Sequence, residues 1–174
     1  QAQSKTAPKA GASPAPASSP ASSSSSSSFP RFSVGANMGA ATSPNIGTFD
    51  LGFEAPIEFN NNWAVGPWMQ IGMADDLTLL LVSLNTRYSF DLFESTKARK
   101  LRPYLQGGLG LAYAKPDAVD GETDFLINMG IGAEYAVSDH FFVGSDVMIN
   151  TIPTTSAANG VLFSWQFARL RYRF

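Results

Sequence analysis

The feature that most constrains this chain is an alternation of apolar and polar residues that recurs along most of its length. Between residues 48 and 59, one set of alternate positions is apolar: Phe49, Leu51, Phe53, Ala55, Ile57 and Phe59. Successive side chains of a β-strand point to opposite faces, so this period of two predicts strands. The alternating segments are longer than the usual strand of about 5–6 residues and match the roughly 9–11 tilted residues that cross a membrane.

We expect eight such strands, at residues 31–40, 48–59, 63–74, 77–90, 102–114, 124–136, 141–150 and 161–174. The face opposite the apolar one is rich in glycine, asparagine and serine. Glycine weakens an open strand face, but it suits the narrow interior of an eight-stranded barrel. We therefore predict an all-β, eight-stranded antiparallel up-and-down transmembrane β-barrel, with apolar residues toward lipid and small polar residues in the lumen. A soluble ligand-binding barrel of the lipocalin type is the alternative fold.

Residues 1–28 have a different composition, dominated by alanine, serine and proline. They lack the apolar periodicity of a folded element, so we expect a disordered N-terminal tail followed by the barrel at 29–174. A passive spacer is the leading interpretation of the tail, and a binding or modified tail is the alternative. No secretory leader is visible at Gln1, so we expect a mature chain whose signal peptide has been removed.

Composition excludes several classes of function. The formal net charge is −2 and no basic stripe is present, so nucleic acid is not an expected partner. The chain contains no cysteine and therefore has neither a disulfide framework nor a thiolate metal site. No apolar run reaches the roughly 18 residues of a transmembrane helix. We expect no cofactor and no enzymatic activity.

Turn lengths predict the orientation of the barrel. The short turns at 60–62 and 138–140 and the longer connection at 91–101 fall at the same end as both termini. Outer-membrane barrels place short turns on the periplasmic side, so we expect both termini to be periplasmic. The connections at 41–47, 75–76, 115–123 and 151–160 would then face outward. Aromatic residues that fit interfacial girdles are Trp63, Tyr88, Tyr113, Tyr135 and Tyr172.

Strand parity places a set of charged side chains on the inward face: Asp50, Glu54, Glu58, Arg87, Glu134, Asp146, Arg169, Arg171 and Arg173. An isolated charge inside a closed barrel is costly, so opposite charges are expected to meet. We predict that Glu54 or Glu58, and Glu134, pair with Arg87, Arg169 or Arg171. A gate or narrow ion path is the alternative, because rings of charge set the selectivity of pores.

Three other groups of residues are candidate sites. His140 is the only histidine, and its place in a turn beside Asp139 and Ser138 favours an interfacial residue over a catalytic triad. An acidic cluster could attract divalent ions that bridge to lipopolysaccharide, with a solvated loop as the default: Asp117, Asp120, Glu122 and Asp124. A basic cluster could contact anionic headgroups, with a solvated turn as the default: Lys97, Arg99, Lys100 and Arg102.

The end of the chain resembles the C-terminal signature of bacterial outer-membrane barrels, with Leu170, Tyr172 and Phe174 on one face. The segment at 103–113 resembles the fifth strand of the OmpA-like and general outer membrane β-barrel domain families, and the segment at 130–146 resembles their sixth and seventh strands. The resemblance covers about 29–174. It implies a bacterial outer-membrane location, contact with outer-membrane lipid and lipopolysaccharide, and recognition of the last strand by the barrel assembly machinery.

The family hosts anchors, adhesins, small pores and lipid enzymes, so it implies fold better than function. The leading interpretation is a non-enzymatic structural or anchoring barrel whose tail reaches a periplasmic or envelope partner. A small pore or conduit for ions or apolar solutes is one alternative. A surface-binding, adhesin-like module acting through residues 115–123 and 151–160 is another.

Overall fold

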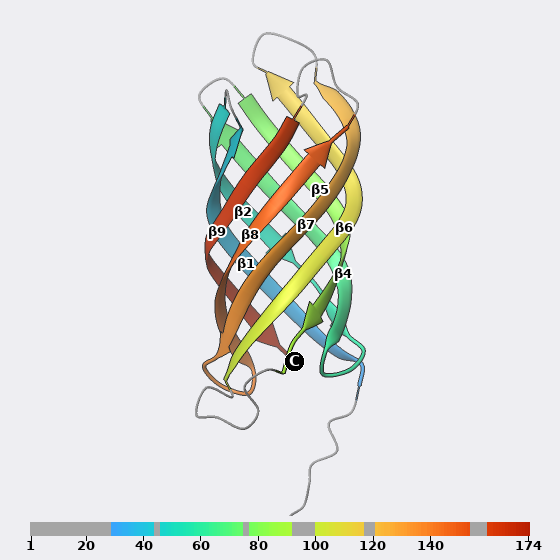
Figure 1. Ribbon diagram of the computed structural model, residues 1–174, viewed down its shortest axis with the longest axis vertical. Coiled ribbons are helices and arrows are strands. Elements are labelled where there is room, and N and C mark those ends of the chain that lie inside the picture. Colours follow the sequence, from blue (N-terminus) through green and yellow to red (C-terminus); the bar gives the residue numbers. More distant parts are fainter. Residues whose placement is uncertain (1–28, 44–45, 75–76, 92–99, 117–120, 154–159) are drawn as a thin grey trace, which may run out of the picture.

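The computed structural model describes residues 29–43, 46–74, 77–91, 100–116, 121–153 and 160–174. These residues form a closed antiparallel barrel, in which β1 pairs with β9 to complete the ring (Figure 1). The strands are β1 (Arg31–Ser43), β2 (Ile46–Glu54), β3 (Ile57–Glu58), β4 (Trp63–Ala74), β5 (Leu77–Ser89), β6 (Leu101–Pro116), β7 (Glu122–Ala136), β8 (Phe141–Ile152) and β9 (Gly160–Arg173). Among the described residues, no helix is long and apolar enough to cross a membrane.

The predicted strand at 48–59 is interrupted. It is divided into β2 and β3, which occupy one position in the barrel between β1 and β4, so the eight-stranded architecture holds. Ser33 N donates to Pro56 O at 3.0 Å and Ala55 N donates to Pro67 O at 3.1 Å. Proline has no N–H to return either bond, which explains why the ladder breaks at this point.

Several strands extend further toward the loop end than the alternation predicted. Residues 41–43 belong to β1 and residues 46–47 to β2, so the loop expected at 41–47 is wrong in its bounds. Likewise β6 continues to Pro116 and β7 begins at Glu122, inside the loop expected at 115–123. The start of β1, the turn at 60–62 and the C-terminus lie together at one end of the barrel, here called the terminal end (Figure 1). The opposite end is called the loop end.

The outer wall is apolar, as the alternation predicted. Its exposed side chains include Leu84, Leu109, Ile131, Phe163 and Trp165. At the terminal end, the rings of Trp63 and Tyr88 lie 4.9 Å apart edge to face, and those of Tyr172 and Phe174 lie 5.2 Å apart. Aromatic side chains at strand ends suit the interface between hydrocarbon and headgroups.

Candidate functional site

The lumen of the barrel gathers almost all of the buried charge of the described residues. Three arginines of β9 reach it because that strand contains a bulge. Its register shifts between Gly144 and Asp146 of β8 and between Met38 and Ala40 of β1, so β9 has an extra residue near Phe167 and Ala168. The extra residue reverses the parity of β9. Ser164 and Gln166 face inward before the bulge, and Arg169 and Arg171 face inward after it.

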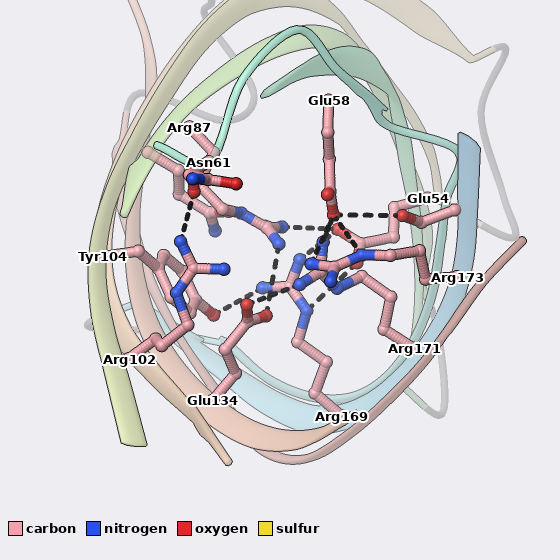
Figure 2. Close-up of polar contacts among 12 residues, drawn as sticks. Glu54, Glu58, Asn61, Arg87, Arg102, Tyr104, Glu134, Arg169, Arg171 and Arg173 are labelled. Carbon is pink, nitrogen blue, oxygen red and sulfur yellow. Dashed lines mark hydrogen bonds and ion pairs between the residues drawn. The ribbon is translucent and has the colours of Figure 1, made fainter. Parts of the chain in front are cut away.

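Glu54 joins two arginines from distant strands. Arg87 Nη2 lies 2.7 Å from Glu54 Oε2, and Arg169 Nη2 bonds the same oxygen (Figure 2). Arg169 Nη1 also lies 2.7 Å from Asp146 Oδ2, so this guanidinium bridges two carboxylates. These contacts link β2, β5, β8 and β9 across the interior.

A second set of ion pairs lies nearer the terminal end. Arg171 Nη1 is 2.7 Å from Glu58 Oε1, and its other nitrogen, Nη2, bonds Glu134 Oε1. Arg173 Nη2 is 3.0 Å from Glu58, while Arg87 Nη1 is 3.8 Å from Glu134 and connects the two sets. We call the whole group the lumen charge network: Glu54, Glu58, Arg87, Glu134, Asp146, Arg169, Arg171 and Arg173. The structure thus brings together eight of the nine inward charges predicted from strand parity, while Asp50 is buried outside the network.

Two aromatic rings pack among these charges and were missed by the sequence analysis. The Tyr104 hydroxyl donates to Asp146 Oδ2 at 2.8 Å, and the guanidinium carbons of Arg87 and Arg169 lie 4.6 and 5.2 Å from its ring centre. Arg171 and Arg173 lie 4.7 and 4.4 Å from the ring of Phe142. Aromatic faces attract desolvated cations, so both rings stabilise the arginines. The available signal was strand parity, since Tyr104 shares the inward face of β6 with Gln106 and Phe142 shares that of β8 with Asp146.

Glycines make room for the long charged side chains. A Cβ at Gly132 would lie 2.5 Å from the Tyr104 ring and 2.6 Å from the Asp146 Cβ. A Cβ at Gly35 would lie 2.7 Å from Glu54 Oε1. At either distance the neighbouring side chain must shift, and Tyr104, Asp146 and Glu54 are all held by contacts within the network, so a side chain at these positions would disturb it.

The part of the lumen toward the loop end is apolar, which corrects the prediction that the inward face carries small polar residues throughout. We call this cluster the apolar plug: Trp68, Leu79, Leu81, Ala112, Leu126, Met148, Ile152 and Leu162. Buried polar side chains lie among and beside the plug, here called the mid-lumen layer: Asn37, Asp50, Gln70, Asn150, Ser164 and Gln166. Along β9 the order is Leu162 of the plug, Ser164 and Gln166 of the layer, then Arg169 of the network. Along β8, Met148 of the plug lies between Asp146 of the network and Asn150 of the layer.

The other candidate residues do not assemble into a second site in the described part of the chain. His140 Nδ1 lies 2.9 Å from Arg173 O, and its ring stacks on Tyr172. The Ser138 hydroxyl accepts from the backbone N–H groups of His140 and Phe141, as a turn residue does. The histidine therefore packs against the end of β9.

The two surface clusters are only partly described. Asp117 and Asp120 lie outside the described residues, as do Lys97 and Arg99. Glu122 and Asp124 belong to β7. No group of three or more histidine, cysteine or acidic side chains that could hold a metal ion occurs among the residues described. Lys100 is exposed, and Arg102 lies 3.4 Å from Asp91 and bonds Asn61 O.

The three residues of the expected assembly signal share the outer face of β9 at the terminal end. Leu170, Tyr172 and Phe174 are all exposed on the wall of the barrel, and Phe174 N donates to Phe32 O at 2.9 Å. The terminal residue thus pairs with the first strand and lies beside the seam that closes the ring.

Several solved bacterial outer-membrane barrels share this architecture. Neisserial surface protein A matches with a TM-score of 0.64 and 21% identity, covering 83% of this chain and 96% of that one. The N-terminal β-barrel domain of Pseudomonas aeruginosa OprF matches with a TM-score of 0.60 and 16% identity, covering 82% and 97%. Ail of Yersinia pestis, solved with the heparin analogue sucrose octasulfate, matches with a TM-score of 0.53 and 13% identity, covering 83% and 97%. At these identities the likeness shows the fold.

Comparison by sequence gives the family. No curated protein matches the chain significantly. The model of the outer membrane protein beta-barrel domain family matches residues 10–167, which is most of the chain. The closed barrel, its apolar wall and its charged interior agree with that match. The protein is therefore a member of the outer membrane protein beta-barrel domain family and an outer-membrane β-barrel.

Proposed function

We propose that this protein is a non-enzymatic anchor with a closed lumen, not a pore. The observation that carries the proposal is the filling of the lumen by two different kinds of packing. The charge network lies toward the terminal end, and the apolar plug, with buried polar side chains among its members, lies toward the loop end. An ion following the lumen would have to separate paired charges and then enter apolar surroundings, and both steps are costly.

Conductance across a planar bilayer tests the closed lumen. The full chain, refolded in detergent and inserted into the bilayer, is expected to add no steady current steps. A porin inserted by the same procedure serves as the positive control, and protein-free detergent serves as the blank. Reproducible steps of fixed size from this protein would contradict the anchor and favour the small pore for ions or solutes.

The N-terminal tail is the part of the proposed anchor that would contact a partner. We propose that both termini face the periplasm and that residues 1–28 tether a periplasmic or envelope partner to the membrane. In an extended conformation of about 3.1 Å per residue, the tail would span on the order of 80–90 Å. Added protease should leave the tail intact in whole cells and remove it after the outer membrane is permeabilised. Cleavage in intact cells would reverse the orientation.

A surface-binding role is less well supported by the composition of the loop end. Ail was solved with a polysulfated ligand, which needs a basic surface. Here the corresponding connections carry acidic residues, Asp75, Asp76, Asp117 and Asp120, with Lys115 nearby. Charge repulsion disfavours a polyanionic ligand at this end. We therefore do not carry that binding activity over to this chain.

A further inference from the structure

Asp50 is the buried carboxylate that the lumen charge network leaves out. It lies in β2 with 0% of its surface exposed. Glu54, Glu58, Glu134 and Asp146 each form an ion pair with an arginine. Within the described residues, none of the ion pairs includes Asp50. An ionised carboxylate in such surroundings is costly unless a positive charge compensates it.

The polar contacts of Asp50 do not supply that charge. Thr48 Oγ1 donates to Asp50 Oδ1 at 2.9 Å, and Gln70 is its other polar neighbour. Asp50 Oδ2 has no hydrogen-bond partner among the residues that the structure describes. One carboxylate oxygen is therefore buried and available to a ligand.

Several amide oxygens of the surrounding mid-lumen layer have no hydrogen-bond partner among the described residues. Gln70 Nε2 and Asn150 Nδ2 both donate to Ser164 Oγ, at 3.2 and 3.0 Å, and each uses one of its two N–H groups in this way. Gln70 Oε1 and Asn150 Oδ1 have no partner in the described part of the chain. Neither Oε1 nor Nε2 of Gln166 has one there, and Gln166 is fully buried. Buried oxygens without a donor are ligands that a hard cation can bind.

Two glycines lie beside this carboxylate. Asp50 pairs with Gly39 across β1 and with Gly72 across β4. A Cβ at Gly72 would lie 2.8 Å from Asp50 Oδ1, and a Cβ at Gly39 would lie 2.7 Å from Gln166 Oε1. Both neighbouring strands thus lack a side chain at the level of Asp50. Gly39 thus lies between Asp50 of β2, its strand partner, and Gln166 of β9, whose Oε1 lies beside its Cβ position.

We propose that the mid-lumen layer binds one alkali-metal cation at Asp50, with side-chain oxygens of Gln70 and Gln166 as neutral ligands. All of these ligands are oxygens, which hard cations prefer. One carboxylate is neutralised by one monovalent ion, whereas a divalent ion would leave excess positive charge beside the arginines of the network. An ion held only by the folded barrel stabilises it by mass action.

Thermal unfolding of the full chain in detergent tests the site. The unfolding temperature is measured in sodium chloride and in N-methyl-D-glucamine chloride, at the same pH and ionic strength. The wild-type barrel should unfold at a lower temperature without sodium, and Asp50→Asn should unfold at the same temperature in both salts. The control Glu122→Gln removes an exposed carboxylate and should keep the sodium dependence. If the wild-type temperature follows pH but not the cation, Asp50 carries a proton and the proposal is wrong.

A direct measurement covers the case in which Asp50→Asn fails to fold. Relaxation of ²³Na should be enhanced by the wild-type barrel at low sodium concentration and should return to the blank value when lithium or potassium competes. Gln166→Leu keeps the carboxylate and removes a neutral ligand, so its sodium affinity should fall by about 10–100-fold. An unchanged affinity in this variant, or displacement of sodium only by calcium, would overturn the proposal.

Discussion

Arg169 is buried in the lumen and is held there by three polar side chains. Its guanidinium contacts Glu54, Asp146 and the Tyr104 hydroxyl, and it is almost completely buried. Each contact comes from a different strand, so this side chain ties opposite walls of the barrel together. Its replacement would leave two carboxylates without part of their compensation.

We therefore expect Arg169→Ala to lower the free energy of unfolding by roughly 3–5 kcal/mol, the usual cost of breaking a buried ion pair. Urea titration of the refolded barrel, followed by tryptophan fluorescence, measures the change. Lys100→Ala, which removes an exposed cation, is the control and should change stability little. Equal stability of the two variants would show that the interior is hydrated enough to solvate the unpaired acids.

Glycine positions can be tested by a matched pair. Gly132→Val should destabilise the barrel by at least about 1–3 kcal/mol, because its side chain would collide with Tyr104. Gly107→Val is the control, since a Cβ there meets only Asn128 O, at 3.4 Å, on the outer wall. The same urea titration compares them. A tolerated Gly132→Val beside a damaging Gly107→Val would reverse the assignment of faces.

At the scale of the element, β5 shows what the sequence predicted and what it concealed. Alternation correctly placed Ser83, Asn85 and Arg87 inward. The segment Leu79–Leu80–Leu81–Val82 has no alternation, because both faces of β5 are apolar there: one meets the outer wall and the other forms the plug. The alternation of apolar and polar residues distinguishes the two faces of a strand. It does not show that the interior changes from charged to apolar along the barrel axis.

The irregularities of the strands could not be predicted from the alternation of residues either. The bulge in β9 reverses parity between Gln166 and Arg169, and nothing in the local sequence marks which residue is extra. The break at Pro56 depends on the pairing partners of that residue, which only the closed barrel defines. The inward charged residues could be predicted from the sequence because ionisable side chains of a membrane strand are disfavoured on the lipid face and therefore point into the lumen.

The last strand carries a prediction about assembly. Deleting Phe174 should reduce the amount of barrel inserted into the outer membrane, with little change in the strand content of protein refolded in detergent. Phe174 contributes one backbone bond, to Phe32, so the folded barrel loses little. Membrane fractionation and circular dichroism provide the two measurements. Phe174→Tyr keeps an aromatic end and is expected to assemble; full insertion of the deletion variant would argue against an assembly signal.

For the whole molecule, the division into tail and barrel predicts that the barrel folds without the tail. Removing residues 1–28 should leave refolding and the unfolding temperature unchanged, since the described barrel closes through β1 and β9 without them. The shift between folded and unfolded bands on gels run with and without heating reports both quantities. Failure of the shortened chain to refold would show that the tail contributes to the fold.

The two kinds of packing in the lumen also bear on how much of this protein a cell can tolerate. A water-filled barrel adds a leak with every copy, so its abundance is limited by the loss of solutes. A barrel filled by paired charges and by an apolar plug adds membrane area without adding permeability. We expect high expression of the wild-type chain to leave the uptake of small antibiotics unchanged, so that crowding of the membrane, and not leakage, sets the upper limit on copy number.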